Sequence, residues 1–132
     1  TPLFKKLNFK MQKEICIINP PAEFEEEMEE MAKVAFIISN LNDCKNAAFI
    51  ISFVKTKKEI ETIFSALAKK LKGDAIVWFA YPKKTTKKYS VEINRDYGWD
   101  VLRKGGLDTV RAVSIDDDWR ALRFRKVAFI KK

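Results

Sequence analysis

The sequence predicts an α/β sandwich with a mainly parallel sheet, and three observations predict it. Several runs are apolar at every position rather than at alternate positions, which is typical of strands covered on both faces. Two of these runs are joined by residues 56–73, whose apolar side chains recur at helical spacing. Two further runs flank Asp116-Asp117-Asp118, which indicates a closing antiparallel β-hairpin.

Length and composition favour one folded domain over residues 1–132. With 47% hydrophobic and 33% charged residues, the chain resembles a globular protein rather than a disordered one. No apolar run reaches the roughly 18 residues that cross a bilayer, and residues 1–13 lack the pattern of a secretory signal. We therefore expect a cytoplasmic protein with no membrane partner. Cys16 and Cys44 are far apart and form no CxxC pair, so we expect unpaired thiols.

The first expected strand is Ile15 to Ile18, and Asn19-Pro20-Pro21 ends it. A helix is expected from Pro20, because proline is favoured at the first helical position and the glutamates that follow suit the positive helix end. Its inward face is supplied at helical spacing by Phe24, Met28 and Met31.

Two more strands are expected at Val34 to Ile38 and at Ala47 to Val54. The polar link between them, residues 39–46, holds no crossover helix. Either the two strands form an antiparallel hairpin, or an extended link returns over another strand. The sequence leaves both arrangements open.

The clearest helix begins with Thr56-Lys57-Lys58-Glu59, a capping-box signature. Its apolar face is expected to run to Leu71, and Gly73 is expected to end it. The helix lies between the strand that ends at Val54 and one that begins near Ala75, so the three form a βαβ unit with a right-handed crossover. That unit is the skeleton of a Rossmann-like three-layer sandwich.

The remaining elements follow a lysine-rich loop. Asn94 is expected to cap a helix that contains Trp99 and ends at Gly105-Gly106. Strands at Thr109 to Ile115 and Trp119 to Phe129 then form a C-terminal β-hairpin on the edge of the sheet.

The best candidate for a site is the end of the apolar run 75–81, which stops at Pro82-Lys83-Lys84. In open α/β sheets, ligands bind outside the carboxyl ends of the strands. We expect Lys83, Lys84 and Arg95 to supply positive charge for a small anionic ligand. Hydrogen bonds and one wall of the pocket are expected from Asn19, Asn94 and Trp119. The alternatives are a solvated loop for the lysines and core packing for Trp119.

Several chemistries are excluded by residue types. The chain has no histidine, which excludes Ser-His-Asp and Cys-His catalysis and the usual zinc sites. The three aspartates at 116–118 match no established cation-binding loop, so we expect a turn and no metal site. The net charge is +8 although a block of glutamates lies within residues 23–30, which makes an anionic partner plausible.

Four segments together resemble a family of short bacterial proteins. They are Leu3-Phe4-Lys5-Lys6-Leu7, Ile17-Ile18-Asn19-Pro20-Pro21, Val77-Trp78-Phe79-Ala80-Tyr81-Pro82-Lys83-Lys84 and Ile115-Asp116-Asp117-Asp118-Trp119-Arg120-Ala121-Leu122-Arg123-Phe124-Arg125. The family is the domain-of-unknown-function family three-zero-five-two, and the match covers nearly the whole chain. The resemblance implies a bacterial protein and assigns it no activity.

Residues 49–79, with the helix and hairpin after them, also resemble the second half of class I methyltransferases that use S-adenosylmethionine. That family has a glycine-rich loop after its first strand, whereas this chain has Asn19-Pro20-Pro21. No acidic residue ends the second strand, which runs into Ser39-Asn40. Without the glycines the backbone cannot closely approach a nucleotide-type cofactor, so a shared fold would not by itself imply the activity.

These observations favour a non-catalytic or degenerate-enzyme module that binds a small anionic ligand or a protein partner. The alternative is a methyltransferase-like enzyme with an atypical cofactor site. A third hypothesis is a basic module that binds nucleic acid through Arg120, Arg123, Phe124 and Arg125. The third is disfavoured, because no recognition motif is present and the acidic block would oppose wrapping.

Overall fold

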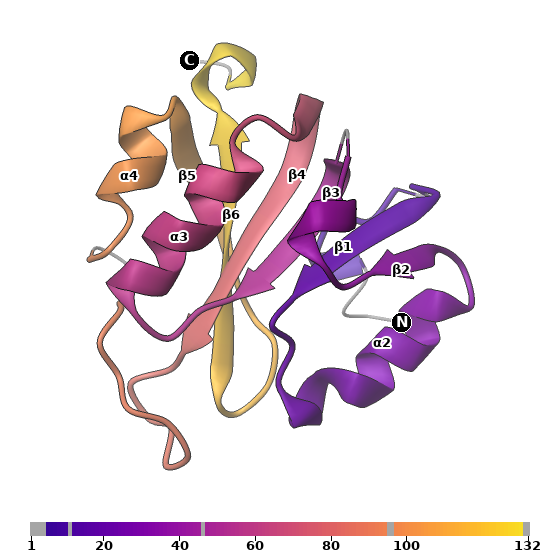
Figure 1. Cartoon of the computed structure of the whole chain (residues 1–132). Coiled ribbons are helices and arrows are strands. Elements are labelled where there is room, and N and C mark those ends of the chain that lie inside the picture. The colour runs from indigo at the N-terminus through magenta and orange to yellow at the C-terminus, as the bar shows by residue number, and fades with distance from the viewer. Residues whose placement is uncertain (1–4, 11, 46, 95–96, 131–132) are drawn as a thin grey trace.

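Six strands form one sheet in the computed structural model, which describes residues 5–10, 12–45, 47–94 and 97–130 (Figure 1). The strand order is β2-β1-β3-β4-β6-β5. The strands are β1 (Glu14–Ile18), β2 (Phe36–Ile38), β3 (Ala47–Phe53), β4 (Leu71–Pro82), β5 (Leu107–Ser114) and β6 (Trp119–Lys126). The first four are parallel, and β6 is antiparallel to both β4 and β5. The predicted α/β class, with a mainly parallel sheet and a C-terminal hairpin, is therefore confirmed.

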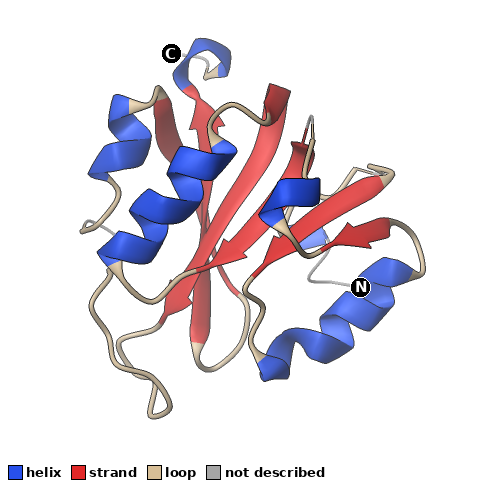
Figure 2. Ribbon diagram, in the orientation of Figure 1, coloured by secondary structure: helices blue, strands red, loops and turns tan. Residues whose placement is uncertain are grey.

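Helices lie on both faces of the sheet (Figure 2). They are α2 (Glu25–Ala32), α3 (Lys57–Leu67) and α4 (Asp100–Lys104), with short 3-10 turns η1 (Ala22–Phe24), η2 (Leu41–Asp43) and η3 (Val127–Phe129). One apolar cluster joins α3 and α4 to one face, and a second joins α2 and the segment around Leu7 to the other. Alternate residues of the central strand β4 enter the two clusters: Val77 and Phe79 the first, Trp78 and Ala80 the second. This alternation explains why the run is apolar throughout.

Residues 39–45, the described part of the link between β2 and β3, carry the chain across β1. Strand β1 pairs in parallel with β2 on one side and with β3 on the other, so β2 and β3 are not neighbours. Of the two arrangements that the sequence left open, the extended link is correct and the hairpin is wrong. The link carries η2, whose start is capped by the Asn40 side chain accepting the Asn42 N–H at 2.8 Å.

The strand expected at 34–38 is shorter and more exposed than its apolar sequence suggested. Strand β2 begins at Phe36, which is 69% exposed, and Val34 lies in the preceding turn. Because β2 is the outermost strand on this side, β1 is the only strand that pairs with it. Ile38 packs partly against the cluster on one face and Ile37 against the cluster on the other, so the expected cover on both faces holds for β2 only in part.

The helix predicted from Thr56 has the predicted start and a different end. Its capping box is formed, since the Thr56 hydroxyl accepts the Glu59 N–H and the Glu59 carboxylate accepts the Thr56 N–H, both at 3.1 Å. The helix ends at Leu67 rather than near Gly73. Residues from Leu71 already extend β4, and Gly73 has a φ of +51° within that strand, near a register shift between β3 and β4.

The last helix also begins later than predicted. Helix α4 starts at Asp100, and Asn94 acts through its backbone, whose carbonyl accepts the Trp99 indole N–H at 2.9 Å. The helix ends at Gly105 as predicted. A Cβ at this glycine would lie 2.5 Å from the Phe64 ring, so the absence of a side chain lets α4 lie against this ring of α3. Strand β6 ends at Lys126, and η3 replaces the expected strand up to Phe129.

Both cysteines are buried and unpaired, as expected. They belong to the α3-side cluster, and burial together with a hydrogen bond between the two thiols raises the pKa of Cys16 far above its ordinary value. In the described part of the chain, no helix has the length and apolar character needed to cross a membrane.

Candidate functional site

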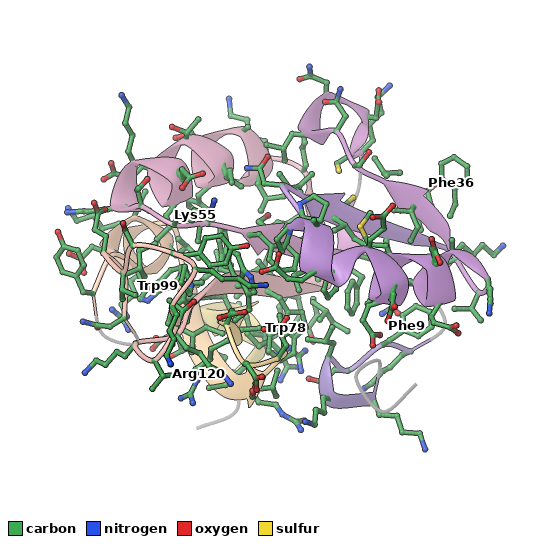
Figure 3. The ribbon with its side chains drawn as sticks, turned by 90° about the horizontal axis from the view of Figure 1, so that it is seen from below. Phe9, Phe36, Lys55, Trp78, Trp99 and Arg120 are labelled. Atoms are coloured by element: carbon green, nitrogen blue, oxygen red, sulfur yellow. The ribbon has the colours of Figure 1, made fainter. Side chains whose placement is uncertain are left out.

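A cavity of about 310 Å³ lies at the carboxyl end of β4. Its lining comes from the end of β4, the loop after it and the start of β6, namely Tyr81, Pro82, Lys83, Lys84, Thr85, Ile93, Asn94 and Arg120. Figure 3 looks onto this edge of the sheet, with Arg120 labelled. The site forms where β4 ends and β6 begins: Pro82 pairs with Trp119, and the Lys83 N–H donates to the Asp118 carbonyl at 2.8 Å.

The charged groups of this lining are all cationic. Lys83, Lys84 and Arg120 contribute three positive charges, and no carboxylate is among the described lining residues. The Lys83 ammonium donates to the Ser114 hydroxyl at 2.6 Å, and Ser114 lies opposite Arg120 across the hairpin. Within the described residues, Lys84 and Arg120 have no ion-pair partner. The cavity is therefore electropositive and suited to an anion.

The floor of the cavity is apolar and rigid. Tyr81 and Ile93 are almost fully buried, and the Tyr81 ring packs edge-on against Trp99 with centroids 5.7 Å apart. The indole of Trp99 in turn holds the backbone of Asn94 through the hydrogen bond described above. A planar or aliphatic group would lie against this floor while an acidic group faced the cations.

The loop 83–93 is tied to three other segments. Its Thr86 hydroxyl donates to the Asp118 carboxylate at 2.8 Å, and its Glu92 carboxylate accepts the Lys57 N–H of α3 at 2.7 Å. The Asp118 carboxylate also pairs with Lys88 at 3.7 Å. A loop fixed at both ends keeps its lysines near one position, which lowers the entropic cost of binding a ligand.

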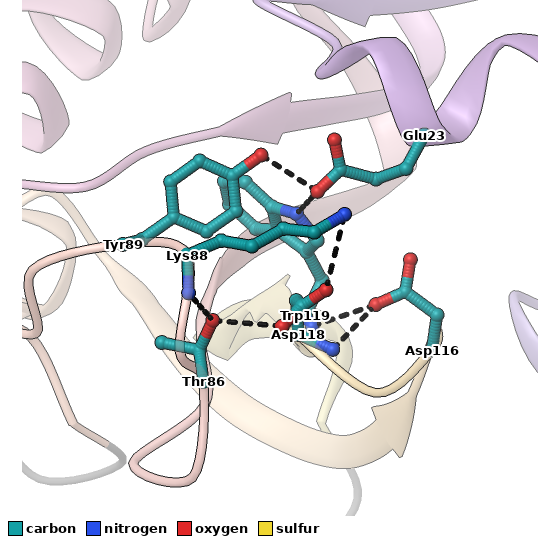
Figure 4. Close-up of polar contacts among 7 residues, drawn as sticks. All are labelled: Glu23, Thr86, Lys88, Tyr89, Asp116, Asp118 and Trp119. Carbon is teal, nitrogen blue, oxygen red and sulfur yellow. Dashed lines mark hydrogen bonds and ion pairs between the residues drawn. The ribbon is translucent and has the colours of Figure 1, made fainter.

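The third tie is a polar cluster around Glu23 (Figure 4). One Glu23 carboxylate oxygen accepts the Tyr89 hydroxyl at 2.6 Å and the Trp119 indole N–H at 3.0 Å. Burial alone would raise the pKa of Glu23, but these two hydrogen bonds outweigh it and hold the pKa below its ordinary value. Burial, with the bond to Glu23, raises the pKa of Tyr89 to about 12. The Lys55 ammonium lies 4.7 Å from the centre of the Tyr89 ring.

The site residues predicted from the sequence do not all lie at one cavity. Lys83, Lys84 and Asn94 line the cavity, whereas Arg95 lies outside the described residues. Trp119 is 1% exposed and packs against Phe53 and Tyr89, and it is not among the lining residues. The lining residues that sequence reasoning missed are Tyr81, Pro82, Thr85, Ile93 and Arg120. For Arg120 a signal existed, because the residue after a buried Trp119 in a strand points to the opposite face.

Asn19 lies at a second depression, where the strand order reverses between β1 and β3. This depression measures about 240 Å³ and is lined by Asn19, Lys58, Glu59, Thr62 and Ile63. A reversal of this kind is the usual ligand position in a doubly wound sheet. Here Asn19 has a φ of +53°, in the left-handed region that asparagine tolerates better than most residues. Pro20 and Pro21 then lead directly into η1.

Comparisons with known proteins address the fold. No family model matches this chain, and no curated protein matches it. Among solved structures, an S-adenosylmethionine-dependent methyltransferase from Aquifex aeolicus aligns with a TM-score of 0.65 and 11% identity, over 96% of this chain and 88% of that one. The chain has a methyltransferase-like fold.

Two further structures show the same fold. An N-methyltransferase from Bradyrhizobium japonicum, in complex with S-adenosyl-L-homocysteine, gives a TM-score of 0.56 at 13% identity, over 94% of this chain and 83% of that one. Magnesium protoporphyrin IX methyltransferase from Synechocystis, with bound S-adenosylmethionine, gives 0.57 at 11% identity, over 94% and 74%. The methyltransferase resemblance therefore extends over nearly the whole chain, while the resemblance to the short bacterial family has no support from a family match.

The residues at the β1 turn do not fit S-adenosylmethionine bound there. The turn has two prolines in place of the glycines that let backbone approach a nucleotide-type cofactor. Strand β2 runs into Ser39 and Asn40, so no carboxylate follows it to meet a ribose. The carboxylate nearest in sequence to this turn, Glu23, is occupied by Tyr89 and Trp119. The methyltransferase-like fold is thus present without these cofactor contacts.

Proposed function

We propose that this chain is a methyltransferase-like protein with an atypical ligand site, which binds a small anionic ligand in the cavity at the carboxyl end of β4. The observation that carries the proposal is the charge of that cavity: three cations and no carboxylate among the described lining residues, over an apolar floor. Phosphate monoesters and carboxylates are the ligands that paired lysine and arginine groups recognise best.

Five of the lining residues have distinct parts in this proposal. The guanidinium of Arg120 would bind two oxygens of the anion side by side, and Lys84 would add a point charge. Lys83, held by Ser114, would contact the same group from the β5 side. Tyr81 and Ile93 would pack against the apolar remainder of the ligand and exclude water from it.

The test is a thermal-shift titration with inorganic phosphate, pyrophosphate, citrate and adenosine monophosphate. Binding to the folded state raises the melting temperature by mass action, and we expect a concentration-dependent rise with at least one of these probes. The double variant Lys84→Ala, Arg120→Ala should lose it. The matched control is Arg111→Gln, which removes an exposed arginine from the neighbouring strand. An unchanged titration of the double variant would contradict the site.

A second candidate is an enzyme that uses S-adenosylmethionine through an atypical site, and the shared fold is the observation that favours it. Calorimetric titration with S-adenosylmethionine and with S-adenosyl-L-homocysteine separates the two candidates. Micromolar binding of either compound that survives Lys84→Ala, Arg120→Ala would favour this enzyme and a site away from the cavity. No heat from either compound, with a shift from a simple anion, would favour the first candidate.

A further inference from the structure

The β-hairpin carries three arginines on the face opposite the cavity. Arg111 of β5 lies directly across from Arg123 of β6, and Arg125 follows two residues later along β6. Residues opposite one another in antiparallel strands share a face, as do residues two apart. The three guanidinium groups therefore follow the hairpin as a row, whereas Arg120 belongs to the other face and lines the cavity.

Two of the three arginines are held in place by described neighbours. The Arg123 guanidinium donates to the Asn8 side chain at 3.2 Å, and Asn8 is in the left-handed conformation with a φ of +62°. Arg125 makes a bidentate contact with Asp74, at 2.8 and 2.5 Å. Positioned arginines lose less entropy on binding than free surface chains do.

The local charge is positive: Asp108 lies opposite Arg125 and pairs with Arg103, so it does not neutralise the row. Asp74 is bound to Arg125, and among the described residues Arg111 has no ion-pair partner. The Nε atom of Arg123 is buried and has no hydrogen-bond partner in the described structure. Burial and the like charges of Arg125 and Arg111 lower the pKa of Arg123, while Asp74 opposes this effect. An anion placed over this row would relieve the repulsion.

Apart from Glu23, which binds Trp119 at the start of β6, the acidic block lies away from this row. Its exposed residues Glu25, Glu26 and Glu29 lie on α2, which packs on β2 at the other end of the sheet (Figure 1). The objection that the sequence raised against a polyanionic partner therefore does not hold for the hairpin. Phe124, which the sequence analysis grouped with these arginines, is not available to stack on a base, because its side chain is fully buried.

We propose that the row Arg111, Arg123 and Arg125 binds the phosphodiester backbone of a nucleic acid, independently of the cavity. A row along two strands suits an extended polyanion, whereas a small anion needs groups that converge. With no exposed recognition element on this face among the described residues, the contact is to the backbone and carries no sequence preference. Affinity of that kind is weak, with Kd of roughly 1 to 100 μM at physiological salt.

The test is fluorescence anisotropy with a short labelled oligonucleotide of mixed sequence, titrated with the full chain at several salt concentrations. We expect an association constant whose logarithm falls linearly with the logarithm of salt concentration. Arg111→Gln with Arg125→Gln should reduce the steepness of that fall by about 0.7 to 0.9 for each phosphate that the variant no longer neutralises. Arg111→Lys with Arg125→Lys keeps the charge and should retain most of the slope.

The matched control is Arg120→Gln, on the same strand and the opposite face. It should leave oligonucleotide binding unchanged while weakening the titration with small anions, so the two proposals can fail separately. Circular dichroism establishes that each variant is folded. Absence of oligonucleotide binding at low salt would overturn the proposal, as would an equal weakening in Arg120→Gln. Binding to anionic vesicles but not to the oligonucleotide would also overturn it and assign the face to a membrane. A salt-sensitive dimer that the Arg111 and Arg125 changes abolish would overturn it as well and assign the face to α2 of a second copy.

Discussion

The Glu23 carboxylate connects three segments that are far apart in the sequence. It lies shortly after the first parallel strand and binds side chains 66 and 96 residues further along the chain. These bonds attach the loop 83–93 and the start of β6 to η1, next to the cavity. No local pattern predicts such a cluster, because hydrogen-bond partners at that separation depend on the finished fold. The sequence reasoning accordingly treated Glu23 as part of an acidic block and Trp119 as a candidate pocket wall.

Replacing this carboxylate tests its contribution at the residue scale. Glu23→Gln keeps the shape and removes the charged acceptor, so we expect a decrease of about 1 to 2 kcal/mol in the free energy of unfolding at neutral pH, since the group is only partly buried. Because the folded pKa of Glu23 lies below its ordinary value of 4.5, the contribution is complete above that pH. It disappears as the pH falls through the lower, folded pKa.

Urea unfolding at several pH values between neutral and strongly acidic measures this difference. The gap between the wild type and Glu23→Gln should close at acidic pH. Glu29→Gln, on the exposed side of α2, is the control and should change stability little at any pH. A gap that persisted unchanged into acid would contradict the assigned role of the Glu23 carboxylate.

At the scale of elements, sequence reasoning succeeded where signals were local. The Thr56 capping box, the hairpin turn at 116–118 and the end of α4 at Gly105 each depend on residues a few positions apart. It failed where a boundary depends on a partner far away. Gly73 reads as a helix stop, yet β3 pairs with β4 from Leu71 onward and so places this glycine inside a strand.

Some residues of the candidate site could likewise be predicted from local sequence, and others could not. Lys83 and Lys84 were predictable because the end of a buried strand is visible in the sequence. Arg120, Ile93 and Tyr81 join them only because β6 inserts beside β4, which no local pattern specifies. The order of β2, β1 and β3 was likewise left open, because the polar link 39–46 is compatible with either of two strand arrangements.

The contact of α4 with α3 yields a prediction at the element scale. In Gly105→Ala the new methyl group would meet the Phe64 ring at 2.5 Å, so the ring or α4 must shift. We expect a decrease of about 1 to 3 kcal/mol in the free energy of unfolding, as for other overpacked contacts. Urea unfolding provides the measurement, and the exposed neighbour Lys104→Ala is the control.

A second substitution tests the cause of that decrease. Phe64→Leu removes the ring that the methyl group meets, so the double variant should be destabilised by less than the sum of the two single variants. Simple additivity would mean that the cost arises elsewhere than at this contact.

The whole molecule combines a methyltransferase-like sheet with a distribution of charge that its net value of +8 does not describe. The glutamates gather on α2 beside β2, and the arginine row lies at the opposite end of the sheet on β5 and β6. The cavity occupies the carboxyl edge between these two regions. The proposed ligand site and the proposed backbone-binding row therefore use opposite faces of one hairpin, so both can be occupied at once.

The sandwich also divides its three tryptophans between its layers. Trp99 belongs to the cluster with α3 and α4, whereas Trp78 and Trp119 belong to the cluster with α2, and all three are almost fully buried. Trp78 further donates its indole N–H to the Leu7 carbonyl at 2.8 Å, so its surroundings depend on the docking of the first described residues. Tryptophan fluorescence during refolding thus has separate contributions from the two sides of the sheet. Chains that retain one indole at a time would reveal which side excludes water first.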